Sequence, residues 1–597
     1  MQQMTILLRG SCLAAALFSL MVSHSPSQLQ EKTTMNPNIA PTELRCEYLV
    51  NPLGIDELKP RLSWILEVKD KARGQKQTAY QILVSSSESK LKADEGDLWD
   101  SGRVESNQSN QIEYNGKPLT SRARCYWKVR IWDKDNVVST WSKTAFWSIG
   151  LVQPSDWKAQ WIGARPIVLS GDRQTDSVAR LMAPSPMLRK TFASNKRIVR
   201  ATMFVTALGL YEVQLNGKKV GDHVLAPEWT DYQDRIQYQT YDVTSLITKG
   251  ENVISATLAD GWYVGPVGCF NDLVVNRGKI YNSLDRKLLL QLEIDTTEGH
   301  LEYVISDETW RLNPDGPVRS ADLYLGETYD SRKSPEGWER SGFDDSSWER
   351  ATVYAAPAAA IVAQMNEPVR RTLELNPLAI TEPVKGTYIV DMGQNMVGWC
   401  AIKINEPAGQ EITIRHGEML TEDGRLYTEN LRRASQTDKF IANGKGEQIF
   451  EPRFTYHGFR YVEITGLTKK PTLDMVLGKE VSSDVAAAGS FECSNKDLNK
   501  LWKNILWTQR DNFIGIPTDC PQRDERLGWM ADAQVFAQTA IYNCTMAAFF
   551  TKWVQDIRDA QHPDGRYPDV APVPSYLPFF NAPAWADAGV IVPWRMY

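Results

Sequence analysis

The sequence has no excess of positive charge. Its 597 residues include 67 lysines and arginines against 73 aspartates and glutamates, which gives a formal net charge of -6 and a pI near 5.8. Nucleic-acid binding draws much of its affinity from clustered lysine and arginine side chains that face the phosphates. The composition therefore excludes nucleic acid as the natural partner.

The sequence also lacks closely spaced cysteines, internal repeats and low-complexity linkers. The cysteines beyond residue 27 are scattered, and none has the short spacing of a zinc site. A chain of this size needs no disulfide to fold, although an oxidising compartment would allow pairing. We therefore expect isolated buried thiols at seven positions: Cys46, Cys125, Cys269, Cys400, Cys493, Cys520 and Cys544.

Long apolar runs are missing except for one at the N-terminus. Arg9 precedes an apolar stretch from Cys12 to Val22, and small and polar residues follow as far as Ser27. This stretch is short for a membrane span and is typical of a secretory signal peptide. We predict a signal peptide over residues 1–27, a mature protein without a membrane span, and a periplasmic or extracellular location.

The length predicts several domains, at roughly 100 to 200 residues each. Short β-rich runs separated by turn residues fill three successive regions, from about residue 44 to 150, 157 to 357 and 361 to 479. The first has the strand spacing of an immunoglobulin-like or fibronectin-type sandwich. In the second, Leu210–Leu215 leads into Asn216-Gly217, a strong hairpin signal.

Two features of the β-regions have a structural and a functional interpretation. Trp229, Tyr232, Trp262 and Tyr263 could be flat platforms for sugar faces, or they could be core residues. His416 and Glu418 could be a catalytic pair, or they could be ordinary surface or core groups two positions apart in a strand. The residues alone leave both alternatives open.

The periodicity becomes helical after Phe491. Ser494 can cap a helix, and one face of that helix would carry Leu498, Leu501, Trp502 and Ile505. A second apolar face repeats further along the chain, at Met546, Phe549, Phe550, Trp553 and Ile557. We expect about the last hundred residues to be helical.

One short segment of the helical region concentrates charge. The run from Asp519 to Trp529, with Asp532 close behind, contains four carboxylates, Arg523, Arg526 and an indole. If a helix begins near Asp524, Glu525, Trp529 and Asp532 share one face, but Gly528 makes a loop leading into a helix equally compatible with the sequence. In either case the three side chains are predicted to converge.

Glycosidic-bond hydrolysis needs a carboxylic acid that protonates the leaving oxygen and a second carboxylate. An indole and neighbouring carboxylates would favour the protonated form of Glu525. Asp519 and Asp532 would accept hydrogen bonds from sugar hydroxyls, Arg523 would orient a carboxylate, and Trp529 would cover a sugar face. The structural alternative is a solvated helix start with paired charges, although Pro521, Gly528 and Trp529 are unusual on such a surface.

The run from Asp519 to Trp529 and Asp532 closely resembles the active-site signature of bacterial α-L-rhamnosidases of glycoside hydrolase family 78. The resemblance extends over nearly the whole chain beyond the signal. Further segments are similar to family segments in the same order: 62–64, 98–102, 126–130, 215–217, 260–263, 391–395 and 454–461.

The resemblance implies an architecture of β-sandwiches followed by an (α/α)6 six-hairpin barrel. The expected domains are a fibronectin III-like sandwich (41–150), an N-terminal carbohydrate-binding-like, jelly-roll-like sandwich (151–357), a concanavalin-like sandwich (358–482) and the start of the barrel (488–597). It implies hydrolysis of terminal α-L-rhamnose with inversion, with Glu525 as general acid. Rhamnose would be held by Asp519, Arg523, Trp529 and Asp532, and also by Trp585 and Asp587.

The sequence departs from this family pattern in the length of its helical part. Twelve helices with their loops need roughly 200 residues, whereas Phe491 to Tyr597 comprises 107. We therefore expect an incomplete barrel, without the glutamate that acts as general base in the family. Asp564 and Asp569 are the substitutes that the sequence offers.

Three functions stay open at this point. The first is an α-L-rhamnosidase represented here by part of a longer chain. The second is a catalytically silent rhamnoside-binding protein or an inactive gene fragment. The third is another helical-barrel enzyme such as a polysaccharide lyase, although the cluster offers no tyrosine, histidine or lysine as base.

The expected ligand is a rhamnose-containing oligosaccharide, polysaccharide or glycoside. No cofactor is required for this chemistry. The sequence leaves open a calcium ion in one of the β-sandwiches, since scattered Asp and Asn residues could bind it, but no loop has calcium-ligand spacing.

Overall fold

The computed structural model describes residues 39–68, 73–168, 174, 176–268, 272–574 and 582–597. The predicted signal peptide and Cys269 lie outside these residues. None of the described helices is long and apolar enough to cross a membrane. The six described cysteines are free thiols, as expected, but only four of them are buried, because Cys493 and Cys544 are partly exposed.

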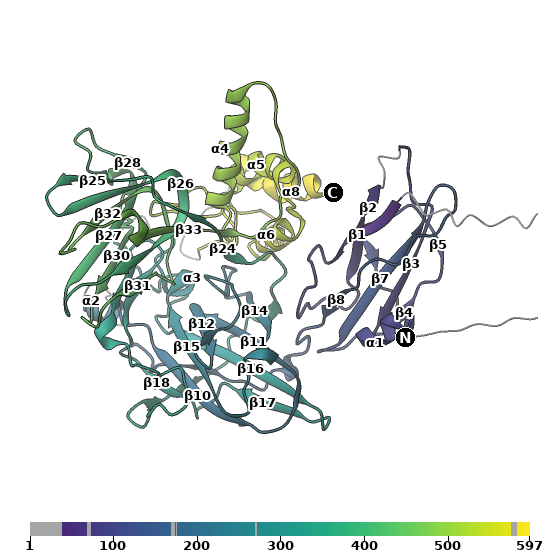
Figure 1. Cartoon of the computed structure of the whole chain (residues 1–597), viewed down its shortest axis with the longest axis horizontal. Coiled ribbons are helices and arrows are strands. Elements are labelled where there is room, and N and C mark those ends of the chain that lie inside the picture. Colours follow the sequence, from purple (N-terminus) through teal and green to yellow (C-terminus); the bar gives the residue numbers. More distant parts are fainter. Residues whose placement is uncertain (1–38, 69–72, 169–173, 175, 269–271, 575–581) are drawn as a thin grey trace, which may run out of the picture.

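The first unit is a two-sheet sandwich, seen on the right of Figure 1. One sheet has the order β1-β2-β6, and the other has the order β4-β3-β7-β8, with β5 pairing β3. Its apolar side chains, among them Trp64, Trp127 and Trp147, form a core of their own. The elements are β1 (Ile39–Cys46), β2 (Arg61–Val68), β3 (Ala79–Ser85), α1 (Glu88–Lys92), β4 (Trp99–Asp100), β5 (Val104–Glu105), β6 (Ile112–Glu113), β7 (Arg124–Trp132) and β8 (Ala145–Ser148).

The second unit packs a sheet of order β13-β12-β15-β10-β18-β21 on one of order β22-β9-β16-β11-β14-β23, with β17 beside β16. The predicted hairpin is present, because Leu215 pairs with Lys218 around Asn216-Gly217. The elements are β9 (Trp161–Gly163), α2 (Val178–Leu181), β10 (Met187–Ser194), β11 (Ile198–Leu208), β12 (Leu210–Leu215), β13 (Lys218–Lys219), β14 (Arg235–Asp242), β15 (Gly250–Ala259), α3 (Gly261–Val264), β16 (Lys287–Thr296), β17 (Leu301–Ile305), β18 (Arg311–Asn313), β21 (Glu349–Arg350), β22 (Thr352–Tyr354) and β23 (Ala360–Ala363).

The third unit is a large sheet of order β19-β20-β30-β27-β32-β26-β33-β24, to which β25 and β31 add at β26. Its hydrogen bonding crosses the boundary expected near residue 357, because β19 and β20 join this sheet while β23 pairs with β14 of the second unit. The elements are β19 (Val318–Asp322), β20 (Gly326–Asp330), β24 (Val369–Leu375), β25 (Ala379–Val384), β26 (Thr387–Ile404), β27 (Glu411–Gly417), β28 (Met419–Leu420), β29 (Leu426–Tyr427), β30 (Thr437–Ile441), β31 (Gln448–Phe450), β32 (His457–Thr465) and β33 (Val476–Ser483).

Helices follow the third sheet, drawn in green and yellow at the top of Figure 1. They are α4 (Lys496–Asn512), α5 (Met530–Asn543), α6 (Ala547–Asp559), α7 (Pro583–Ala586) and α8 (Ala588–Met596). The cap of α4 is Asn495 instead of the predicted Ser494, because the Asn495 side chain accepts from the backbone N–H groups of Asp497 and Leu498. A single residue of displacement is within the usual uncertainty of helix ends.

The two predicted apolar helix faces have different surroundings. Phe549, Phe550 and Trp553 of α6 are fully buried against the β-units. Leu498 and Leu501 of α4 are 48% and 53% exposed. The periodicity therefore predicts the helices and their apolar sides correctly, but not which side is covered.

Buried charges join α6 to the second unit. Arg235 pairs with Asp556 at 2.6 Å and with Asp559 at 2.8 Å. Lys552 pairs with Asp556 at 2.8 Å and donates to the backbone oxygens of Trp229 and Gly515. Because these groups are buried with their partners, the helices and the β-units are held in one geometry.

Candidate active site

The charged run lies in an irregular segment between α4 and α5. Helix α5 begins at Met530 with Trp529 as its cap, so a helix from Asp524 that aligns Glu525, Trp529 and Asp532 on one face is wrong. The loop alternative holds. Glu525 and Trp529 still meet, because the Trp529 Nε1 donates to Glu525 Oε1 at 3.0 Å.

Arg526 holds this loop against the β-units. It has a left-handed φ of 53°, and its side chain is 1% exposed. Its Nη1 donates to the backbone oxygens of Leu323 at 2.7 Å and Tyr456 at 2.8 Å. The guanidinium also lies over the rings of Tyr324 and Tyr456. A buried guanidinium with several acceptors fixes a loop because each acceptor loses a charged hydrogen bond if the loop leaves.

Two glycines allow the close approach of the loop. A Cβ on Gly528 would lie 2.1 Å from the backbone oxygen of Ala571, and a Cβ on Gly458 would lie 2.9 Å from the Cβ of Gln522. Gly528 therefore serves backbone contact with the segment after α6, where Ala571 N donates to its carbonyl at 3.0 Å. Neither position has room for a side chain.

The inner side of the cluster is formed by Asp519, Cys520 and Leu527. Asp519 Oδ1 accepts from the backbone N–H of Leu527 at 3.0 Å, and its Oδ2 accepts from Arg523 Nη2 at 2.9 Å. Burial and the neighbouring Glu525 charge raise the pKa of Asp519 to about 6, against the lowering effect of Arg523. Asp519 therefore carries a proton over part of the mildly acidic range.

The outer side of the cluster is formed by Glu525, Trp529 and Arg432. Besides the indole bond, Glu525 Oε2 accepts from Arg523 Nε at 2.8 Å and from Arg432 Nη2 at 2.5 Å. Burial favours the neutral acid, but the two guanidinium groups outweigh burial and lower the pKa of Glu525. The expectation that its surroundings keep Glu525 protonated is therefore wrong for this conformation, because no pattern in the sequence indicates that Arg432 lies beside it.

Arg432 reaches the cluster from the third β-unit. It follows the short 3-10 turn Glu429–Leu431 and has a φ of 56°, which is unfavourable for a residue with a Cβ. Its Nε lies 3.0 Å from Asp524 Oδ1, so one guanidinium bridges two adjacent carboxylates. Nothing in the pattern Leu431-Arg432-Arg433 separates Arg432 from a surface arginine, and only the fold reveals it.

The predicted pair of His416 and Glu418 separates into two environments. His416 is fully buried and stacks on His457 at 4.2 Å, and burial lowers its pKa to about 3. Glu418 accepts from Gln522 Nε2 at 2.9 Å and from Asn395 at 3.0 Å. The core interpretation of His416 is correct, and Glu418 supports the charged loop.

The aromatic residues of the second unit are also core residues. Trp229, Tyr232, Trp262 and Tyr263 are between 1% and 7% exposed. Trp229 stacks on Trp262, and Tyr232 packs edge-on against Tyr263. They do not form an exposed platform for sugars.

Of the remaining predicted site residues, Trp585 joins the outer side, and no contact among the described residues brings Asp532 or Asp587 to it. Trp585 of α7 packs edge-on against Trp529, with ring centroids 6.4 Å apart. Asp532 in the first turn of α5 and Asp587, the cap of α8, are exposed. The structure thus brings Asp519, Arg523, Glu525, Trp529 and Trp585 into one cluster.

The two substitute carboxylates differ in their surroundings. Asp564 is exposed and pairs with Arg566 and His562. Asp569 lies in the segment that runs beside Trp529, where its carbonyl accepts from Met530 N at 2.9 Å and its side chain from Ala582 N at 3.2 Å. Of the two substitute carboxylates, Asp569 is therefore the one that lies near the charged loop.

Among the residues that the structure describes, two clusters bring at least three potential metal-ligand side chains close together. Asp519, Cys520 and Glu525 form one, but Arg523 pairs with both carboxylates, so the charge that a cation would use is already neutralised. His416, Asp438 and His457 form the other. Calcium requires a set of oxygen ligands, and two imidazoles with one carboxylate do not fit it.

Comparison with known proteins gives the same domain order. Family models match as a Rha78A-like N-terminal immunoglobulin domain (41–153), an alpha-L-rhamnosidase N-terminal domain (196–373), a bacterial alpha-L-rhamnosidase concanavalin-like domain (381–482) and a bacterial alpha-L-rhamnosidase 6 hairpin glycosidase domain (486–597). The fold and the matched domains are those of multidomain six-hairpin glycosidases.

Individual relatives identify the family within this class of glycosidases. The α-L-rhamnosidase of Streptomyces avermitilis is 36% identical over 92% of the chain and 68% of its own length, and that of Alteromonas sp. is 38% identical over 94% and 60%. A crystal structure of the Streptomyces avermitilis α-L-rhamnosidase with L-rhamnose superposes with a TM-score of 0.87 at 34% identity, over 93% of the chain and 68% of that structure. The chain belongs to the bacterial α-L-rhamnosidase family, and it spans about three fifths to two thirds of the length of these relatives.

Proposed function

We propose that this protein takes part in the hydrolysis of terminal α-L-rhamnosyl bonds in glycosides, oligosaccharides or polysaccharides, in an exported compartment. The observation that carries the proposal is the position of Glu525. Its carboxylate is held by Trp529, Arg523 and Arg432 and keeps 14% of its side chain exposed. One side of a well-oriented carboxyl group is thus accessible to a leaving oxygen.

In this proposal Glu525 donates its proton to the glycosidic oxygen. Asp519, Arg523, Trp529, Asp532, Trp585 and Asp587 surround the rhamnose. Inversion needs a second carboxylate about 6.5 to 9.5 Å across from the acid, which activates water. We assign the general acid, Glu525, and assign no residue as the general base.

Arg523 and Arg432 together account for the ionised state of Glu525 before the substrate binds. A general acid must carry a proton when the bond breaks. Arg432 bridges Asp524 and Glu525 and is 42% exposed. We propose that Arg432 keeps Asp524 and releases Glu525 when the sugar enters, because loss of one guanidinium raises the carboxyl pKa.

The test uses leaving groups of different basicity. Aryl and alkyl α-L-rhamnosides are assayed with the 597-residue chain and with Glu525→Gln, and Glu422→Gln, an exposed glutamate of the third unit, serves as control. Loss of a general acid lowers kcat/KM by about 10² to 10⁴-fold, more for the alkyl than for the activated aryl rhamnoside. An equal loss for both would contradict the acid role.

Binding without turnover would favour the catalytically silent alternative. L-rhamnose binding to the same chain is measured by calorimetry, with Trp529→Ala as the comparison. Saturable binding that weakens in Trp529→Ala, with no hydrolysis of any rhamnoside, would replace hydrolysis by recognition at this cluster.

A further inference from the structure

Tyr324 lies in the turn between β19 and β20 and reaches the charged loop from the third unit. Its side chain is fully buried. The hydroxyl donates to the backbone oxygen of Glu525 at 2.5 Å and accepts from the backbone N–H of Gly268 at 2.9 Å. Tyr324 therefore holds the backbone of the residue whose carboxylate is the proposed acid.

The turn that carries Tyr324 is fixed by a buried carboxylate. Asp322 Oδ1 accepts from the backbone N–H groups of Tyr324 at 2.8 Å and Leu325 at 3.0 Å. Its Oδ2 pairs with Arg277 Nη1 at 2.5 Å, and both side chains are buried. A buried ion pair is costly to break, because each charge would lose its partner. The β-units therefore set the position of the Tyr324 hydroxyl.

The backbone of Tyr324 holds the segment that carries Arg432. Its oxygen accepts from the backbone N–H of Gln436 at 3.1 Å. Gln436 is fully buried and has a left-handed φ of 43°. Its side chain accepts from Gly458 N at 2.8 Å and donates to the backbone oxygens of His416 and Gly458, at 3.1 Å each. The short segment from Arg432 to Gln436 thus has one end fixed beside Tyr324.

Tyr324 connects two segments whose side chains meet. Arg432 and Glu525 are 93 residues apart along the chain, and their side chains pair at 2.5 Å. Arg523, the other guanidinium on Glu525, lies two residues away in the same loop, so that pair moves with the loop. The Arg432 pair depends instead on how far the loop lies from the third unit.

We propose that Tyr324 is a positioning residue for Glu525, because its hydroxyl sets the distance between the Glu525 loop and Arg432. The role of Glu525 as acid rests on the proposed function, whereas the contact that Tyr324 controls exists in the free protein. A reacting group must be held close to its productive geometry, and a displacement of about 1 Å can lower the rate by about a hundredfold. Loss of the Tyr324 hydroxyl should therefore affect the chemical step more than sugar binding.

The variant Tyr324→Phe isolates the hydroxyl. It keeps the aromatic ring, which lies 5.1 Å from Arg526 Cζ, and the backbone oxygen that accepts from Gln436. It removes the bond to the backbone of Glu525. The loop can then move relative to Arg432 without the loss of its other anchors.

The experiment follows the charge of Glu525 through Trp529, whose indole donates to Glu525 Oε1 at 3.0 Å. In protein labelled with 5-fluorotryptophan, the ¹⁹F resonance of Trp529 is titrated with pH. Tyr324→Phe should raise the apparent pKa of Glu525 toward that of an ordinary glutamate, because Arg432 is the guanidinium that a loosened loop leaves behind.

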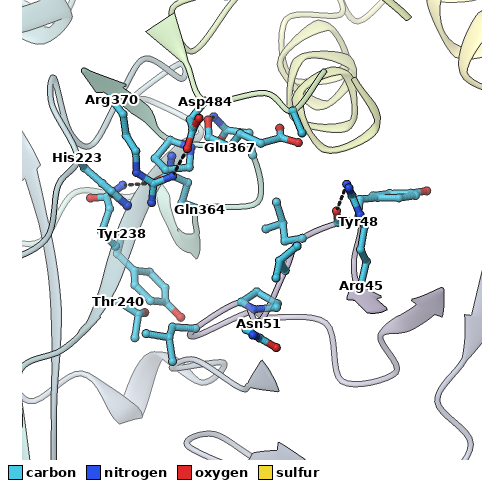
Figure 2. Close-up of a pocket in the computed structure, with 18 residues that line it drawn as sticks. Arg45, Tyr48, Asn51, His223, Tyr238, Thr240, Gln364, Glu367, Arg370 and Asp484 are labelled. Atoms are coloured by element: carbon cyan, nitrogen blue, oxygen red, sulfur yellow. Dashed lines mark hydrogen bonds and ion pairs between the residues drawn. The ribbon is translucent and has the colours of Figure 1, made fainter. Parts of the chain in front are cut away.

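The matched control is Tyr238→Phe. Tyr238 is labelled in Figure 2, in the wall of a cavity of about 400 Å³ whose lining, among the described residues, includes none of the charged loop. Tyr238 is also fully buried, and its hydroxyl accepts from Leu151 N at 2.8 Å and donates to Asp56 Oδ1 at 2.9 Å. Both variants should lower the thermal unfolding temperature, but Tyr238→Phe should leave the Trp529 titration unchanged.

A double variant tests whether Tyr324 acts through Arg432. Tyr324→Phe is combined with Arg432→Gln, and the apparent pKa of Glu525 is compared with its value in each single variant. Two changes that act through one contact are not additive. Tyr324→Phe should therefore raise this pKa little further once Arg432 is absent.

Hydrolysis of an alkyl α-L-rhamnoside by the 597-residue chain gives a separate readout. Tyr324→Phe should lower kcat by about tenfold or more and change KM little, and Tyr238→Phe should change neither. If the parent chain hydrolyses no rhamnoside while the Trp529 titration shifts as expected, the proposed function fails and the positioning of Glu525 by Tyr324 stands.

Four results would overturn the role of Tyr324. One is an unchanged Trp529 titration in Tyr324→Phe, and another is an equal shift in Tyr238→Phe. The third is a full further rise of the Glu525 pKa when Tyr324→Phe is added to Arg432→Gln. The fourth, in a parent chain that hydrolyses the alkyl rhamnoside, is an unchanged kcat in Tyr324→Phe.

Discussion

The inner and outer sides of the charged loop contain carboxyl groups with opposite electrostatic behaviour. Asp519 and Glu525 share Arg523, yet the pKa of Asp519 is raised to about 6 and that of Glu525 is lowered. Both are partly desolvated. Asp519 is the more deeply buried of the two, and Arg432 brings a second guanidinium to Glu525 while Asp519 has a backbone N–H instead. Depth of burial and the number of positive donors together decide which carboxyl group ionises.

This difference also separates two structural roles. The inner side is attached to the helical region through Leu527, whereas the outer side is attached to the third β-unit through Arg432. A change in how the β-unit sits on the helices would therefore alter Glu525 and leave the contacts of Asp519 in place.

The largest change in stability is expected at Arg526, because it holds the loop that carries both the inner and the outer side of the cluster. Arg526→Met removes two charged hydrogen bonds to the buried carbonyls of Leu323 and Tyr456, worth about 1.5 to 3 kcal/mol each. The unfolding free energy should fall by roughly 3 kcal/mol or more, measured by urea titration of tryptophan fluorescence. Arg425→Met, an exposed arginine paired with Asp423, is the control and should change little.

The next effect concerns the pH dependence of the inner side. Because folding raises the pKa of Asp519, this group favours the folded state fully below its unfolded pKa near 3.8, and that stability is lost as pH rises through about 6. The loss is roughly 3 kcal/mol by pH 7. In Asp519→Asn the decline between pH 4 and 6.5 should shrink, as measured by urea unfolding at several pH values.

The Glu525→Gln variant should change the pH dependence of stability in the opposite direction. The lowered pKa of Glu525 gives stability that is present above its unfolded value and is lost as pH falls through the folded one. The variant should therefore lose stability near neutral pH and resemble the parent in acid. Equal pH profiles for Asp519→Asn and Glu525→Gln would show that the two sides are not distinct.

A smaller effect, a change in the pKa of Glu525, measures the contribution of Arg432 by itself. The Trp529 indole donates to Glu525, so in protein labelled with 5-fluorotryptophan its ¹⁹F resonance should report the titration of Glu525, with Trp529→Phe giving the assignment. Arg432→Gln should raise the apparent pKa toward that of an ordinary glutamate, and Arg432→Lys should raise it less. Arg425→Gln should leave the titration unchanged. An unshifted titration in Arg432→Gln would remove Arg432 from the electrostatics of the site.

The smallest effect is expected at Asp532. It is exposed on the first turn of α5, so Asp532→Asn should change the unfolding free energy by no more than about 0.5 kcal/mol. If Asp532 accepts from a sugar hydroxyl as proposed, the variant should weaken L-rhamnose binding without moving the Trp529 resonance. A shift of that resonance in the free protein would instead place Asp532 in the electrostatic cluster.

Most of the architecture could be predicted from the sequence because it depends on local patterns. Alternating strands, the Asn216-Gly217 hairpin and the apolar faces of α4 and α6 all follow from side-chain period and turn chemistry. The helix boundary at Met530 could not be predicted. Residues 519–529 stay irregular because Arg526 and Gly528 bind distant carbonyl and amide groups, and such contacts leave no local periodicity.

The sequence by itself determined the family, the domain order and the segment that carries Asp519, Arg523, Glu525 and Trp529, because these depend on residue type and spacing. Only the tertiary structure decided the charge state of those groups and the burial of Trp229, Trp262 and His416. Charge state depends on what lies within a few ångströms and on how much water is displaced. Arg432 is 93 residues from Glu525 along the chain, and the fold alone brings the two together.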